Sequence, residues 1–190
     1  MREIPYNPFD LLSVPRRPCL DLDLLEKNFR SLSTKYHPDH SSGDRTLFEH
    51  IQKAAALLRR TSSRLQALAE EKSKEKNIPL PAQELFSTLA AAIEESVVKR
   101  NAYQKTSTAL AKALLFDDLL HAQRALLHAQ ASLETWKHTL EEELATIDSQ
   151  WPTVPEEKVI VLAKSFLFVE RWEEKLNEEI FELSTLLPEH

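Results

Sequence analysis

Glycine occurs only once in the 190 residues of this chain. Tight turns and β-sheets rarely form without glycine, whereas long helices avoid it because of its conformational entropy. Hydrophobic residues make up 42% of the chain, which is enough for a packed core and too many for a disordered protein. The sequence therefore predicts an all-α fold.

Two amphipathic helices separated by a rigid corner are predicted near the N-terminus. The apolar residues of the first helix step by three or four positions, and they are Leu22, Leu25, Phe29, Leu32 and Tyr36. The same spacing returns after the corner at Leu47, Ile51, Ala54 and Leu58. The corner is a His-Pro-Asp tripeptide at positions 37–39, and its proline ends the first helix. We expect Asp21 or Asp23 to cap the first helix and Asp44 to cap the second.

Three long helical patterns follow, over about 83–114, 117–149 and 156–187. In the second pattern an apolar residue recurs every seven positions, at Leu119, Leu126, Leu133, Leu140 and Ile147. Three such stripes joined by short connections predict a three-helix bundle. Pro79 and Pro81 indicate a stiff linker over 76–82, which divides the chain into domains of residues 1–75 and 83–190.

Charge is unevenly distributed along the chain. Residues 1–75 contain 13 Lys and Arg against 11 Asp and Glu, whereas residues 76–190 contain 11 against 19. The acidic second part argues against a nucleic-acid partner, which requires a basic surface. No apolar run is long enough for a membrane span, and no signal peptide is visible, so we expect a cytoplasmic protein. Cys19, the single cysteine, excludes an internal disulfide and any multi-cysteine metal site.

Residues 5–70 resemble a J-domain, the DnaJ-type module that stimulates ATP hydrolysis by a DnaK-type chaperone. The resemblance rests on His37-Pro38-Asp39 between two helices, and on similar segments at 7–12, 51–58 and 64–68. It implies that Asp39 pairs with an Arg of the chaperone while His37 and Pro38 hold the corner. Because the chaperone performs the hydrolysis, we expect no enzyme activity, catalytic residue, cofactor or metal here. The residues alone also fit an ordinary helix end stopped by proline.

Three basic residues, Lys27, Arg30 and Lys35, lie off the apolar stripe of the first of these helices. In J-domains such a basic face meets an acidic chaperone surface and accelerates the encounter. The alternative is a solvated helix face without a partner.

A J-domain followed by a three-helix bundle resembles the HscB family. These co-chaperones bring an IscU-type iron–sulfur cluster scaffold to an HscA-type chaperone. Residues 166–176 are similar to the family's Leu-x-Phe-Leu-x-Lys-Leu pattern, although Leu167 stands where the family has an Arg. The scaffold-binding helix of the family matches two registers here, 85–89 and 92–100, each only in part.

The resemblance implies a client face on the first and third bundle helices, through Phe86, Leu89, Ile93, Leu167 and Phe168. The apolar residues around Phe168 fit equally well with the wide apolar face that any three-helix bundle needs. The expected partners are a DnaK/HscA-type chaperone and an IscU-type scaffold. Two alternatives stay open: a J-domain co-chaperone for a different client, and a helical assembly protein with a vestigial J-domain.

Overall fold

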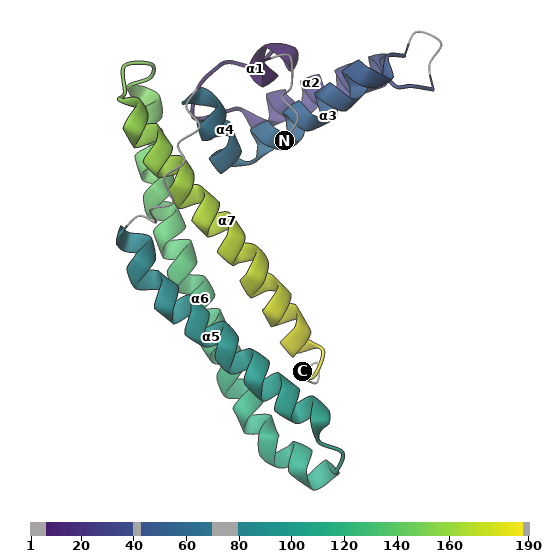
Figure 1. The fold of residues 1–190 in the computed structure, drawn as a ribbon, viewed down its shortest axis with the longest axis vertical. Helices are drawn as coiled ribbons and strands as arrows, with labels where there is room; N and C mark the ends of the chain where they lie inside the picture. Colours follow the sequence, from purple (N-terminus) through teal and green to yellow (C-terminus); the bar gives the residue numbers. More distant parts are fainter. Residues whose placement is uncertain (1–6, 40–42, 70–79, 188–190) are drawn as a thin grey trace. The chain divides into compact units, whose positions relative to one another are not determined.

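The computed structural model describes residues 7–39, 43–69 and 80–187, with side chains from residue 85 onward in the last range. All regular secondary structure in these ranges is helical, in seven α-helices (Figure 1), which confirms the all-α prediction. The chain forms two compact units. Met1–Glu75 and Glu141–Lys164 make the first, and Lys76–Leu140 and Ser165–His190 make the second. None of the described helices combines the length and apolar composition that a bilayer crossing requires.

The N-terminal helix α1, Pro8–Leu11, ends in a tight turn without glycine. Ser13 has a φ of 52°, in the left-handed region that glycine usually occupies. The amide of Ser13 donates to the carbonyl of Asp10 at 3.1 Å, and the amide of Val14 donates to that of Phe9 at 3.0 Å. These two bonds form a Schellman motif, and their energy offsets the backbone strain of a non-glycine residue at this position.

Helices α2, Leu22–Lys35, and α3, Arg45–Arg59, lie side by side (Figure 1). The carboxylate of Asp21 caps α2 by accepting from the amides of Asp23 and Leu24 at 3.0 and 3.1 Å. Asp44 caps α3 by accepting from the amide of Leu47 at 3.0 Å. Of the two predicted caps for α2, the structure selects Asp21, and the predicted cap of α3 is confirmed.

The short helix α4, Thr61–Leu68, follows α3 after a break at Arg60. The large side chains of this part of the first unit that are fully buried come from all four helices and their connections. They are Phe9, Leu12, Leu25, Ile51, Leu58 and Leu65. Burial of each such side chain stabilises the fold by roughly 1.5–3 kcal/mol, so these residues hold α1 to α4 together.

The long helix after the N-terminal part ends earlier than predicted. Helix α5 spans Leu80–Lys105 and α6 spans Ala109–Ser149, so the break lies at 106–108 instead of near 115. Thr108 Oγ1 accepts from the amide of Ala111 at 3.3 Å, and this hydroxyl cap starts a helix where apolar periodicity alone suggested continuity. Leu110 and Leu114, expected in the apolar stripe of the first helix, are each 74% exposed near the start of α6.

The seven-residue repeat of α6 is buried at all five predicted positions, Leu119, Leu126, Leu133, Leu140 and Ile147. Helix α7, Glu156–Ser184, starts after Pro155, as predicted. In the second unit a buried carboxylate connects α7 to α5: Glu179 accepts from Ser96 Oγ at 2.8 Å and from two nitrogens of Arg100 at 3.0 Å. Because an unpaired buried charge is costly, this network favours one register of α5 on α7.

Candidate functional site

The His-Pro-Asp corner follows the last turn of α2. His37 Nδ1 accepts a hydrogen bond from the backbone amide of Asp39 at 3.3 Å. The imidazole ring also contacts the ring of Phe48 on α3 edge-on, with a centroid separation of 5.2 Å. The carboxylate of Asp39 lies 3.5 Å from the same nitrogen and its side chain is 87% exposed. The corner thus fixes the histidine against the hairpin and leaves the aspartate accessible to a partner.

The basic residues predicted on α2, Lys27, Arg30 and Lys35, are exposed. The ammonium of Lys35 lies 5.0 Å from the ring centroid of Tyr36, within the range of a cation–π contact. No carboxylate of a described residue forms an ion pair with Lys27 or Arg30. The exposed face of α2 therefore presents positive charge next to the corner.

An ion pair that the sequence analysis missed supports this basic face. Arg59, at the end of α3, donates from Nε and Nη2 to the two carboxylate oxygens of Glu26 at 2.6 and 3.1 Å. Its guanidinium also lies 4.6 Å from the ring centroid of Phe29. The hydrogen bond from Arg59 holds the pKa of Glu26 below its usual value. The acid beside Lys27 is therefore engaged by α3. Its partner is 33 positions away, which no local pattern indicates.

An open groove of about 440 Å³ lies beside the corner. Helices α2 and α3 and the corner line it through Phe29, Arg30, Ser33, Thr34, His37, Phe48 and Gln52. The hydroxyl oxygen of Ser33 is buried and has no hydrogen-bond partner among the described residues. The groove joins the corner to the basic face, so one surface combines an exposed carboxylate, positive charge and an apolar floor.

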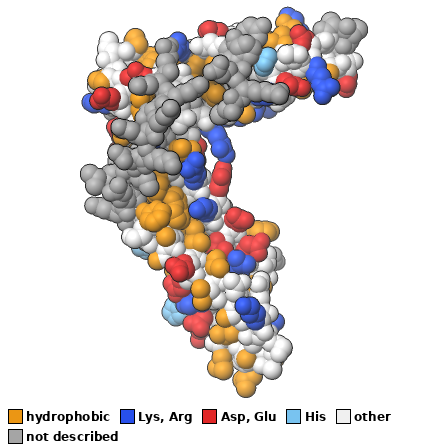
Figure 2. Space-filling view, viewed as in Figure 1, with side chains coloured by type: hydrophobic (Ala, Val, Ile, Leu, Met, Phe, Trp, Pro, Cys, Tyr) orange, Lys and Arg blue, Asp and Glu red, His pale blue; other side chains and the backbone are white. Residues whose placement is uncertain are grey.

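The five residues predicted for the client face have different environments in the second unit. Phe86 is 46% exposed, and Ile93 and Leu167 are half-buried. Leu89 is fully buried and Phe168 is 9% exposed, so both side chains belong to the interior. Only part of the predicted set is therefore accessible to a partner. Figure 2 shows hydrophobic side chains gathered on the visible face of this helical region.

Aromatic side chains from α5, α6 and α7 form a connected cluster. The ring of Phe168 packs edge-on against Trp136 at 5.5 Å and lies 5.9 Å from Trp172. Trp172 in turn packs edge-on against Phe86 at 5.5 Å, and Lys175 lies 4.9 Å from its ring centroid. Phe168 and Trp172 are thus the buried middle of the cluster and Phe86 its exposed rim. This arrangement favours a core role for Phe168 and leaves Phe86 as the surface member.

Residues 7–66 match the DnaJ domain family. This part of the chain is a J-domain. A search of curated proteins and a search of solved structures found no match to the chain. The matched J-domain residues include the corner at 37–39 and the three basic residues of α2, and they do not extend to α5, α6 or α7.

A J-domain implies a co-chaperone role, in which an Hsp70-type chaperone is the partner and its ATPase is stimulated. Proteins with J-domain co-chaperone function are generally not enzymes. The geometry agrees with that role, because the J-domain presents an exposed acid and basic charges to a partner.

Proposed function

We propose that this protein stimulates a DnaK/HscA-type ATPase through its J-domain and delivers an IscU-type iron–sulfur scaffold bound to its helical bundle. The observation that supports the first half is the corner: His37 is held by Phe48 and by the Asp39 amide, while the Asp39 carboxylate is 87% exposed. An exposed carboxylate on a fixed turn is suited to pair with an arginine of the chaperone.

In this mechanism the chaperone hydrolyses ATP, and the J-domain changes the conformation of the chaperone. Lys27, Arg30 and Lys35 steer the J-domain toward an acidic chaperone surface, and Asp39 then forms the charge-paired contact. The Asp39 contact mainly lowers the dissociation rate of the complex, because truncating a buried charge pair at an interface costs about 2–5 kcal/mol of binding free energy and makes dissociation faster.

The test is ATP hydrolysis by a purified DnaK-type and a purified HscA-type chaperone, with increasing concentrations of the full chain. Asp39→Asn removes the charge with little change of volume, so stimulation should be largely lost while the helical circular dichroism is unchanged. His37→Gln should behave similarly because it removes the ring that contacts Phe48. Asp23→Asn, an exposed acid on the same hairpin, is the matched control. Equal stimulation by Asp39→Asn and wild type at every concentration would refute the assignment.

For the client half of the proposal, the support is the order of domains together with the aromatic cluster. Phe86, Ile93 and Leu167 are the proposed contacts because their side chains reach the surface. Leu89 and Phe168 are proposed to support these contacts from below, since both are buried. The absence of an Arg at position 167 favours the alternative of a different client.

Binding of a purified IscU-type scaffold, measured by calorimetry, tests this half. Phe86→Ala should weaken binding by about 2 kcal/mol if it is an apolar anchor, with little change in melting temperature. Phe168→Ala should lower stability by about 3–5 kcal/mol, because it creates a cavity in the cluster. Val98→Ala, at another exposed position of α5, is the control and should change neither quantity.

The outcomes separate the alternatives. If the wild type stimulates the ATPase but does not bind the scaffold, the result favours a co-chaperone for a different client. Absence of stimulation, by a protein that is folded and binds its partners, would favour an assembly protein with a vestigial J-domain.

A further inference from the structure

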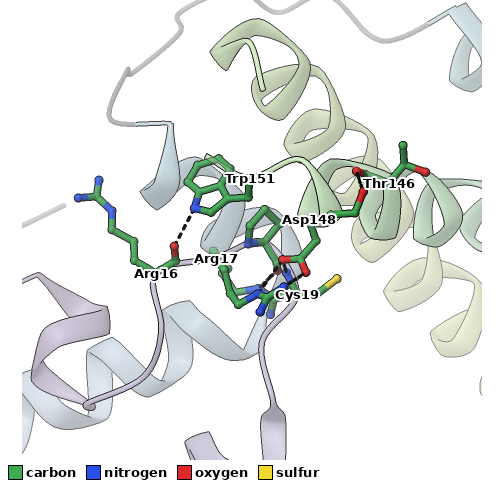
Figure 3. A network of polar contacts seen from close by, with 9 residues as sticks. Arg16, Arg17, Cys19, Thr146, Asp148 and Trp151 are labelled. Carbon is green, nitrogen blue, oxygen red and sulfur yellow. Dashed lines mark hydrogen bonds and ion pairs between the residues drawn. The ribbon is translucent and has the colours of Figure 1, made fainter. Parts of the chain in front are cut away.

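The connection between α1 and α2 is bonded to a segment more than 120 positions away (Figure 3). Near the end of α6, Asp148 accepts from the backbone amide of Cys19 at 2.8 Å and from Arg17 Nε at 3.0 Å. Arg17 Nη2 donates to the second carboxylate oxygen. In the turn after α6, Trp151 Nε1 donates to the carbonyl of Arg16 at 2.9 Å. All of these residues belong to the first compact unit.

The Asp148 carboxylate is largely removed from solvent, with 10% of its side chain exposed against 50% for Arg17. A desolvated carboxylate is tolerated only when donors satisfy it, and here the donors come from the α1–α2 connection. The hydrogen bond from Arg17, together with that from the Cys19 amide, holds the pKa of Asp148 below its usual value. The Asp148 carboxylate is therefore bound specifically by donors of this loop.

The same loop is also held by α4. Arg64, only 5% exposed, donates from Nε to the carbonyl of Pro18 at 2.9 Å and from Nη1 to the carbonyl of Leu58 at 2.9 Å. Leu68 and Ala69, at the end of α4, line a small cavity of about 180 Å³ together with Trp151 and the start of α7. The loop and the end of α4 thus share one neighbour, the α6–α7 turn.

We propose that the α6–α7 turn is an intramolecular clasp of the J-domain. Asp148 and Trp151 bind residues 16–19, which lead directly into the Asp21 cap and the first turn of α2. The clasp fixes where α2 begins, and residues 141–164 are part of the stable J-domain although they lie outside residues 7–66. This inference does not depend on the identity of the chaperone or of the client. It also predicts that the opening of the loop is local, a partial unfolding that leaves the rest of the unit intact.

Cys19 provides a site-specific probe, because it is the single cysteine of the sequence and its amide is bonded to Asp148. Cys19 is half-buried and burial raises the pKa of its thiol, so a thiol reagent should react more slowly while the clasp is closed than after it opens. Reaction of the full-length protein with a disulfide reagent, followed by absorbance, therefore reports how a substitution changes the opening of the loop. The thiolate fraction of each variant is measured in parallel, since Asp148 also raises the pKa of the thiol.

Trp151→Phe is the principal variant because it removes the hydrogen bond to the Arg16 carbonyl and leaves every charge in place. Its reaction should be about threefold faster than that of the wild type. Asp148→Asn should react about tenfold faster after correction for thiolate fraction, which corresponds to about 1.4 kcal/mol. Glu143→Gln, at an exposed acid on the same helix, is the matched control and should react at the wild-type rate.

The dependence on urea distinguishes the clasp from general destabilisation. Local opening exposes little surface, so the reaction rate of the wild type should be nearly constant at low urea, whereas global unfolding accelerates steeply. The proposal is overturned if Trp151→Phe and Asp148→Asn both react at the rate of Glu143→Gln. It is equally overturned if the wild-type rate follows global unfolding from the lowest urea concentration.

Discussion

The two ends of helix α2 are held in opposite ways. At its N-terminal end the preceding loop is bonded by side chains from α4 and α6, and Asp21 caps the first turn. At its C-terminal end, the contacts of the corner include the hydrogen bond from the Asp39 amide to His37 and the ring contact of His37 with Phe48, and the Asp39 side chain is 87% exposed. The corner that presents Asp39 to a partner is therefore at the opposite end of α2 from this attachment.

The largest effect on this contrast should come from removing Arg64 at the attached end. Arg64→Ala leaves the carbonyls of Pro18 and Leu58 without their donor in a buried environment. We expect a loss of about 3 kcal/mol, or a melting temperature lower by roughly 10 °C. Calorimetry measures the change, and ATPase stimulation assayed well below the melting temperature should persist because the corner is untouched. Loss of stimulation in the folded variant would show that the two ends are not independent.

The presented end is tested by charge reversal. Replacing Lys27, Arg30 and Lys35 together by Glu should slow association with the chaperone about tenfold at low salt, because these charges steer the encounter. The difference in rate between the variant and the wild type should shrink at high salt, because the Debye length falls from about 10 Å at 0.1 M to about 3 Å at 1 M ionic strength. Stopped-flow association rates at several salt concentrations measure both effects.

A charge-matched control keeps this test specific. The same three reversals placed on exposed basic residues of the second unit change the net charge equally, and they are Lys105, Arg124 and Arg171. If the control slows association as much as the α2 variant, net charge and not the α2 face determines the rate. Association of the wild type that is independent of salt would exclude steering altogether.

Acid should weaken the attached end of α2. Arg17 and the Cys19 amide hold the pKa of Asp148 below its ordinary value of 3.8. Because the folded pKa is depressed, the stabilisation is complete above the ordinary value and is lost as the pH falls through the lower folded value. The melting temperature of Asp148→Asn should therefore lie several degrees below that of the wild type at pH 7, and this gap should narrow toward pH 3. A gap of equal size at both pH values would contradict the linkage.

The smallest expected effect lies in the turn after α1. Ser13 occupies the left-handed region without being glycine, which carries strain of about 1 kcal/mol. Ser13→Gly relieves the strain but makes the unfolded chain more flexible, so we expect a net gain of about 0.5 kcal/mol. Ser31→Gly, at an exposed position within α2, should have the opposite sign because glycine disfavours a helix interior. Thermal melts of the two variants measure whether Ser13→Gly raises the stability and Ser31→Gly lowers it.

Local patterns were sufficient for the parts of the molecule that depend on neighbouring residues. Apolar spacing and proline predicted where α2 starts and ends, and acidic residues predicted the caps of α2 and α3. The seven-residue repeat of α6 predicted which side of that helix is buried. The corner at 37–39 was recognisable because its geometry is set by three adjacent residues. Each of these features depends on interactions within one or two helical turns.

Other features could not be predicted because their causes are distant or weak in the sequence. The break before α6 depends on a single hydroxyl cap at Thr108, and the apolar pattern continues through it. The partners of Asp148 and Glu26 lie 131 and 33 positions away, and charged residues of the same type are abundant elsewhere. The burial of Leu89 could not be predicted, because the resemblance indicates which helices carry a client face but not which of their apolar side chains the bundle covers.

The order in which the chain is made gives the α6–α7 turn a further consequence. Asp148 leaves the ribosome 131 positions after Arg17, so at roughly 5–20 residues per second it follows by about 7–26 s. During that interval α1 to α4 have been synthesised without the side chains that close on their loop, and α5 and most of α6 emerge in between. The nascent J-domain therefore exists first in a looser form, and its last contacts are made only once the turn after α6 has been synthesised.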